Sequence, residues 1–199
     1  VKDKSGVYGR WRFADQDAMD LIKPPEWLID DCIPMKSYVL LYGQPSTCKT
    51  FVALDMALSV AHGAPDFVSR TPTWGNHVKT RGPVLFCAGE GRSGVTKRVR
   101  AWEKMHNDGD KVPGFVLVDP VPTITSELED FLEGALAYSP QGYSMVVVDT
   151  VGRAMQGVNE NAQENASAFT ALVQVLQNQL DCTVLAIHHS GKQGKKEPA

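Results

Sequence analysis

Short apolar runs alternate along the chain with longer segments in which apolar residues recur at helical spacing. The runs have the length and content of buried strands: SYVLLYG, PVLFCAGEG, GFVLVDP, YSMVVVDT and CTVLAIHHSGK. The segments between them predict helices over residues 49–61, 95–106, 126–138 and 161–180. Because continuous apolar strands alternate with helices, we expect an α/β fold with a mostly parallel sheet covered by helices on both faces.

The two ends of the chain differ from this alternating body. Residues 1–24 are polar and mixed, which predicts an arm or linker, and residues 193–199 predict a disordered tail. The domain itself is therefore expected at residues 25–192. The leading prolines Pro24 and Pro25 block a helix in the stretch PPEWLIDDCIP, whose apolar residues 27–29 predict an anchor onto the domain. The chain begins with valine, so we expect a fragment or a processed product.

Composition narrows the class without naming a function. The content of 43% hydrophobic and 22% charged residues is typical of a globular domain, and the net charge of -3 does not indicate nucleic-acid binding. The four cysteines form no C-x-x-C pair, which favours free thiols in a reducing compartment over disulfides or zinc. No stretch approaches the roughly 18 apolar residues of a membrane span, and no signal peptide is visible. We therefore expect a cytoplasmic protein with no membrane partner.

The segment GQPSTCKT, residues 43–50, lies between the first predicted strand and the first predicted helix. This context and the pattern G-x-x-x-x-G-K-[ST] are typical of a phosphate-binding loop, in which backbone N–H groups at a helix N-terminus bind phosphate oxygens. The pattern has glycine where this chain has Cys48, whose Cβ is expected to crowd the phosphate. The candidate nucleotide-binding residues are Gly43, Pro45, Ser46, Thr47, Cys48, Lys49, Thr50 and Phe51.

Polar side chains follow the other strands at the edge where parallel sheets bind ligands. Asp149 ends the fourth strand, where a carboxylate can hold a Mg²⁺-bound water or simply cap a turn. Glu90 follows the second strand between two glycines, either as the base that deprotonates water or as a solvated loop residue. His188 and His189 end the fifth strand and point to opposite faces. One is expected to sense the γ-phosphate and the other to pack, unless both are ordinary structural histidines.

Two further stretches leave a choice between a contact and an ordinary surface. The segment after the second strand is locally basic, which predicts a solvated helix face or a DNA or subunit contact; its residues are Arg92, Lys97, Arg98, Arg100 and Lys104. The polar loop at residues 152–165 is either an ordinary connection or a segment that touches nucleic acid through asparagine and glutamine.

Four segments taken together, in this order, resemble one family. LLYGQPSTCKTFVALDMALSVAHG, GPVLFCAGEG with RVRAW, VVVDTVGRAMQGVNENAQENASAF and TVLAIHHSGK are similar to the RepA-like ATPases of the RecA/DnaB-type superfamily found in plasmids and phages. The resemblance covers about residues 25–195. It implies a RecA-like P-loop NTPase core, ATP and Mg²⁺ as cofactors, a ring homo-oligomer that is often a hexamer, and single-stranded DNA as the polymer on which a replicative helicase moves.

The resemblance also implies roles for individual residues. Lys49 and Thr50 match the phosphate-loop pair, Glu90 the catalytic glutamate, Asp149 the magnesium aspartate and His189 the γ-phosphate sensor, so that Thr50 and Asp149 are the expected metal ligands. The arginine finger and the DNA-binding loop of such rings follow the HH-x-G-K strand, where this chain ends. We therefore expect a core that lacks its last strands.

Three functions remain to be weighed. A DNA-dependent ATPase motor agrees with all four segments, and an ATP-switched regulatory or assembly ATPase agrees with the nucleotide site alone. Arg153 or Lys192 could reach a neighbouring subunit's nucleotide in either case. A small-molecule kinase would need an arginine-rich lid that the sequence lacks, and the absence of an NKxD segment speaks against a GTPase. The preference for ATP therefore rests on elimination and resemblance.

Overall fold

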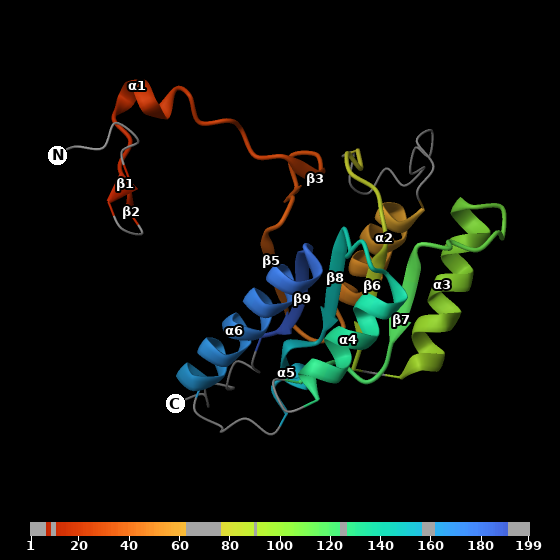
Figure 1. Cartoon of the computed structure of the whole chain (residues 1–199). Coiled ribbons are helices and arrows are strands. Elements are labelled where there is room, and N and C mark those ends of the chain that lie inside the picture. The colour runs from red at the N-terminus through yellow and green to blue at the C-terminus, as the bar shows by residue number, and fades with distance from the viewer. Residues whose placement is uncertain are drawn as a thin grey trace, which may run out of the picture.

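A five-stranded parallel sheet forms the centre of the molecule (Figure 1). The computed structural model describes residues 7–8, 11–62, 77–89, 91–123, 127–156 and 162–190. The strand order is β5-β9-β8-β6-β7, and every neighbouring pair is parallel. The strands are β5 (Tyr38–Gly43), β6 (Val84–Ala88), β7 (Phe115–Val118), β8 (Met145–Asp149) and β9 (Thr183–His189). All five carboxyl ends therefore lie at the same edge of the sheet.

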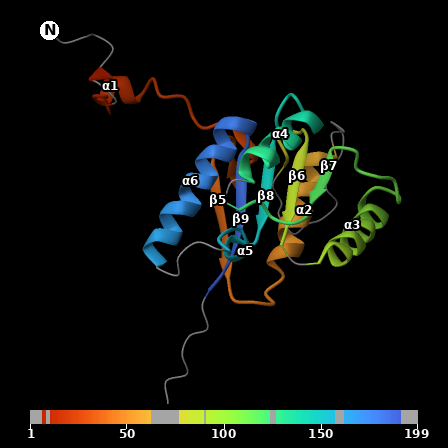
Figure 2. The same ribbon diagram turned by 60° about the horizontal axis from the view of Figure 1, so that its bottom comes forward.

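Helices cover both faces of this sheet (Figures 1 and 2). On one face lie α2 (Lys49–Ala61) and α3 (Arg92–His106), and on the other lie α4 (Leu128–Tyr138) and α6 (Ala162–Leu180). A short helix, α5 (Val151–Ala154), follows β8 directly. The predicted α/β class is confirmed, and the arrangement is that of a P-loop NTPase core.

The central strands send alternate side chains into two apolar cores. In β6, Val84 and Phe86 join the core beneath α2, while Leu85 and Cys87 join the core beneath α6. All five residues of β6 are buried, as are all five of β8. Burial on both faces explains why these strands are continuous apolar runs.

The strand β5 is the exception to this pattern. Its side chains alternate between half-buried and exposed, and Tyr38, Leu40 and Tyr42 are 41%, 45% and 60% exposed. Among the described residues β5 pairs only with β9, so it forms an edge of the sheet. The prediction that this run is a buried strand is therefore wrong for one face of β5.

Short elements precede the sheet and were not predicted. They are β1 (Val7–Tyr8), β2 (Trp11–Arg12), α1 (Gln16–Met19), β3 (Trp27–Ile29) and β4 (Ile33–Pro34). The first three lie apart from the sheet in Figure 1. In β3, Leu28 and Ile29 are buried in the core beneath α2, which agrees with the apolar anchor predicted there. No helix in the described part of the chain is both long and apolar enough to cross a membrane.

Candidate functional site

The loop after β5 turns sharply into the N-terminus of α2. Ser46 and Cys48 have left-handed backbones, with φ of 63° and 61°, and Cys48 is the N-cap residue of α2 without a side-chain hydrogen bond to the helix. Alternation of left- and right-handed residues points successive N–H groups into one concavity, which is an anion-binding geometry. The first N–H groups of α2 add to it, because a helix N-terminus has unpaired donors. The backbone here is therefore shaped to hold a phosphate.

Lys49 lies inside this turn rather than on the surface. The residue is only 6% exposed, and its Nζ donates to the carbonyl oxygens of Gly43 at 3.0 Å and Gln44 at 2.6 Å. It also lies 3.3 Å from Oγ1 of Thr47, whose hydroxyl donates to the Gln44 carbonyl. A lysine has three donors and no acceptor, so the loop satisfies the buried ammonium completely. The structure thus places a positive charge at the centre of the loop.

Thr50 joins this loop to a distant strand end. Its Oγ1 donates to Oδ2 of Asp149 at 2.9 Å, although the two residues are 99 positions apart in the chain. Strand β9 lies between β5 and β8 in the sheet, so the contact exists because α2 crosses over that edge. Asp149 is 6% exposed at the carboxyl end of β8. A hydroxyl and a carboxylate oxygen therefore meet beside the phosphate loop.

These two oxygens fit a magnesium ion. Mg²⁺ is typically held in proteins by one or two oxygen side chains, with the remaining positions taken by water and phosphate. No group of three or more metal-ligating side chains occurs in the described ranges, so a dense all-protein metal cage is not found there. The pair Thr50 and Asp149 is the arrangement expected where a nucleotide brings the other ligands.

The carboxyl end of β6 packs closely against the same aspartate. The N–H of Gly89 donates to the carbonyl oxygen of Asp149, and a Cβ at position 89 would meet Arg153 atoms at 2.6 and 2.7 Å. Position 89 therefore needs glycine, because the aliphatic part of the Arg153 side chain, which comes from α5, occupies the space that a Cβ would take. The sequence pattern did not predict this contact, and the glycine after the strand was its only signal. Glu90, the predicted base, lies outside the described residues, as does Lys192.

The two histidines at the end of β9 have different surroundings. His188 stacks on Tyr42, with ring centroids 5.6 Å apart. His189 lies beside Gly43 in the sheet, and its Nδ1 is buried with no hydrogen-bond partner among the described residues. A buried nitrogen without a partner is energetically unfavourable, so it indicates a missing polar partner at this edge. His188 makes the packing contact, and the role of His189 as γ-phosphate sensor stays a prediction.

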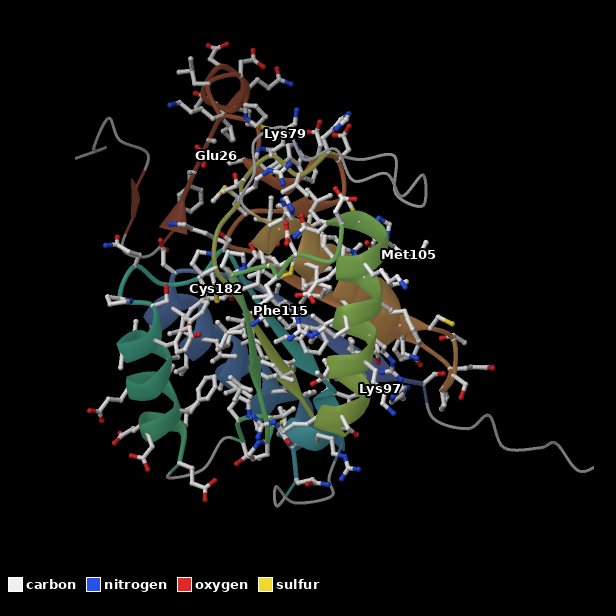
Figure 3. The ribbon with its side chains drawn as sticks, turned by 90° about the vertical axis from the view of Figure 1, so that its right-hand side faces the viewer. Glu26, Lys79, Lys97, Met105, Phe115 and Cys182 are labelled. Carbon is white, nitrogen blue, oxygen red and sulfur yellow. The ribbon has the colours of Figure 1, made fainter. Side chains whose placement is uncertain are left out.

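Most of the predicted basic cluster on α3 is exposed, namely Arg92, Lys97, Arg100 and Lys104. Arg98 lies over the ring of Phe51, with Cζ 4.6 Å from the ring centroid. Arg100 forms an ion pair with Glu103 at 2.6 Å. Lys97 and Met105 project from the same side of α3 (Figure 3). Part of the positive charge of α3 is thus directed to neighbouring side chains.

Burial separates the cysteines. Cys87 and Cys182 are buried, and burial raises the pKa of Cys182 to about 12 and that of Cys87 still further. These thiols stay protonated at neutral pH and are not nucleophiles. Cys32 is half-buried, and Cys48 is exposed in the loop.

Comparison with known families agrees with this geometry. The family model AAA_25, described as an AAA domain, matches residues 6–195, which is nearly the whole chain. No curated protein matches the chain significantly. The matched family consists of P-loop ATPases and is frequent in helicase-like proteins, so it accounts for the phosphate loop and implies a nucleotide, usually with Mg²⁺.

Proposed function

The chain belongs to the AAA domain family of P-loop ATPases, and on this premise we propose that it is the ATP-hydrolysing motor domain of a ring-forming DNA helicase. The observation that carries the ATPase part is the 2.9 Å contact between Thr50 and Asp149 at the N-terminus of α2. It joins the phosphate loop to an acidic strand end, which is the arrangement that metal-assisted phosphoryl transfer needs.

Binding begins at the loop. Backbone N–H groups of residues 45–50 hold the phosphates, and Lys49 exchanges its bonds to the Gly43 and Gln44 carbonyls for bonds to phosphate oxygens. Thr50 and Asp149 would hold Mg²⁺, which would supply positive charge to the phosphates. Each of these groups stabilises the negative charge that grows on the phosphate oxygens in the transition state.

Hydrolysis needs a base and a sensor in addition. Glu90 directly follows Gly89, whose N–H is bonded to the Asp149 carbonyl, and this position in the chain supports a role for it in hydrolysis. We assign to it the orientation and deprotonation of the attacking water. His189, whose buried Nδ1 lacks a partner among the described residues, is assigned the contact with the γ-phosphate.

The second part of the proposal is that ATP hydrolysis drives movement on DNA. It is supported by the resemblance of the four sequence segments to RepA-like ATPases, and it requires a ring in which a neighbouring subunit completes each site. Arginine fingers contribute about 10³- to 10⁵-fold to such rates. A single subunit should therefore hydrolyse ATP slowly, and turnover per subunit should rise with protein concentration.

A second candidate is an ATP-switched regulatory or assembly ATPase that does not move along DNA. The contacts of Arg98 with Phe51 and of Arg100 with Glu103 support it, because they direct part of the positive charge of α3 to neighbouring side chains instead of to a nucleic acid. The two candidates share the nucleotide site and differ in whether ATP hydrolysis drives movement along single-stranded DNA.

Steady-state ATP hydrolysis with and without single-stranded DNA separates them. A motor predicts strong stimulation of turnover by DNA at saturating ATP, with double-stranded DNA as the matched control polymer. Turnover that is independent of DNA would reject the motor in favour of the regulator. No hydrolysis at any protein concentration would reject both.

A further inference from the structure

A groove of about 500 Å³ runs between α2 and α3, beginning at Phe51, the residue that follows the phosphate loop. Its main lining residues are Phe51 and Asp55 of α2 and Lys97, Arg98, Trp102 and Met105 of α3. Phe51 follows Thr50 directly, and the rise of a helix places it about 3 Å along the axis from Lys49. A molecule whose phosphates lie in the loop can therefore continue into this groove.

At the end of the groove next to the phosphate loop, the aromatic ring of Phe51 forms a flat apolar surface, and the cationic side chain of Arg98 lies over it. Phe51 is 53% exposed, whereas residues 53, 54 and 56–58 of the same helix are all nearly inaccessible. The guanidinium of Arg98 lies 4.6 Å from the Phe51 ring centroid. Planar guanidinium groups and aromatic rings both stack on nucleic-acid bases. An exposed aromatic ring paired with arginine, next to a phosphate loop, has the chemistry of a base platform.

The floor of the groove has few polar groups directed to a ligand. Trp102 is 8% exposed, and its indole N–H donates to Asp55 at 2.7 Å. This bond fixes the indole ring and engages its only donor. A ligand in the groove is therefore recognised by stacking and apolar contact more than by hydrogen bonds to its edge.

We propose that Phe51 and Arg98 bind the purine base of the nucleotide whose phosphates the loop holds. The inference rests on the proposed nucleotide site and adds the subsite for the base. Purines present the larger stacking area, so MgATP and MgGTP should bind within a few-fold of each other, and both more tightly than MgCTP.

Calorimetric titration of the 199-residue chain with MgATP and with magnesium tripolyphosphate tests the subsite, because tripolyphosphate has no base. Phe51→Ala should weaken MgATP binding about tenfold and leave tripolyphosphate unchanged. Phe51→Tyr should retain MgATP affinity, and Arg98→Gln should weaken MgATP alone. Tyr138→Ala is the matched control, since Tyr138 is an exposed aromatic residue on α4, 71% accessible and outside the groove.

The outcomes separate this inference from the function on which it rests. Equal losses for both ligands in Phe51→Ala, or no loss for either, would overturn the base subsite and leave the phosphate site intact. A wild-type chain that binds MgATP no better than tripolyphosphate would overturn it too. Binding of neither ligand by the wild-type chain would overturn the proposed function and the subsite together. Because Phe51 is half exposed, the variant is expected to fold, which a thermal melt verifies.

Discussion

Two helices of the same sheet face, α2 and α3, begin at the same edge in closely similar ways. Each has an N-cap residue with a left-handed backbone and no side-chain cap: Cys48 with φ of 61° and Gly91 with φ of 58°. Their surroundings differ. Lys49 in the first turn of α2 is buried and Thr50 contacts Asp149, while an added Cβ at Gly91 would meet nothing within 4 Å.

This difference teaches what a phosphate site requires beyond a helix N-terminus. Both helices have the unpaired N–H groups and the dipole. Only α2 also has a buried lysine, a hydroxyl and a carboxylate at its first turn. At the N-terminus of α3, an added Cβ on the N-cap residue Gly91 would meet no other atom, and Glu90 precedes this residue in the chain. We therefore assign phosphate binding to α2 and water activation to the segment that leads into α3. Four changes test this division, from the largest expected effect to the smallest.

Removal of the buried charge should have the largest effect. Lys49→Ala should lower ATP turnover by at least about 100-fold, because the ammonium at the centre of the loop is lost. Lys104→Ala, in the exposed last turn of α3, is the matched control and should leave turnover unchanged. Steady-state hydrolysis measures both. Similar rates for Lys49→Ala and wild type would show that the phosphates are not held at α2.

A change before α3 should separate binding from chemistry. Glu90→Gln should retain MgATP affinity and lower turnover about 10²- to 10⁴-fold, since the amide keeps the shape of the side chain but cannot accept the proton. Equilibrium binding and single-turnover hydrolysis give the two values. If the variant hydrolyses ATP at the wild-type rate, Glu90 is not the base.

The left-handed N-cap of α3 should be sensitive to any side chain. Gly91→Ala should lower the free energy of unfolding by about 1 kcal/mol, because a Cβ is unfavourable in this backbone region even where space is free. Chemical denaturation measures it. Gly134→Ala in α4 is the control, since it also meets nothing within 4 Å but has no left-handed backbone, and it should not destabilise. Equal behaviour of the two variants would contradict the strain at position 91.

The N-cap of α2 should show the smallest effect, an increase in the free energy of unfolding when its left-handed residue Cys48 becomes glycine. Cys48→Gly should raise the free energy of unfolding by less than about 1 kcal/mol, since relief of the left-handed strain is partly offset by the greater freedom of glycine in the unfolded chain. Phosphate affinity should be equal or higher. Denaturation and tripolyphosphate titration measure the two quantities, and a destabilised variant would mean that the thiol makes a contribution the backbone angle does not reveal.

Several elements could be predicted because local pattern and tertiary context agree in them. The helix expected at residues 49–61 is Lys49–Ala61, and the one expected at 161–180 is Ala162–Leu180. The strands β6 and β8 are buried on both faces, so their apolar runs were unambiguous. The strand β5 was misjudged, because an apolar run gives no information on whether another element covers it.

The sequence suggested which residues belong to the candidate site, but it did not predict how they lie relative to one another. Asp149 could be expected near Thr50 only because parallel strands end at one edge, but the chain does not give the strand order that puts β9 between them. The sequence suggested that Arg153 could reach a neighbouring subunit's nucleotide, but it did not predict that Arg153 lies beside Gly89 in the same chain. Long-range contacts of this kind depend on how the elements pack.

By itself the sequence determined the α/β class, the phosphate loop and the identities of its chemical groups, since periodicity and the residues of positions 43–50 are local properties. Only the tertiary structure decided that Lys49 is buried in the loop, that Thr50 meets Asp149 and that Arg98 lies on Phe51. The physical reason is that the contacts of Thr50 with Asp149 and of Arg98 with Phe51 join elements far apart in the chain, which the packing of α2 against the sheet and α3 brings together, while the burial of Lys49 depends on how the loop folds around it.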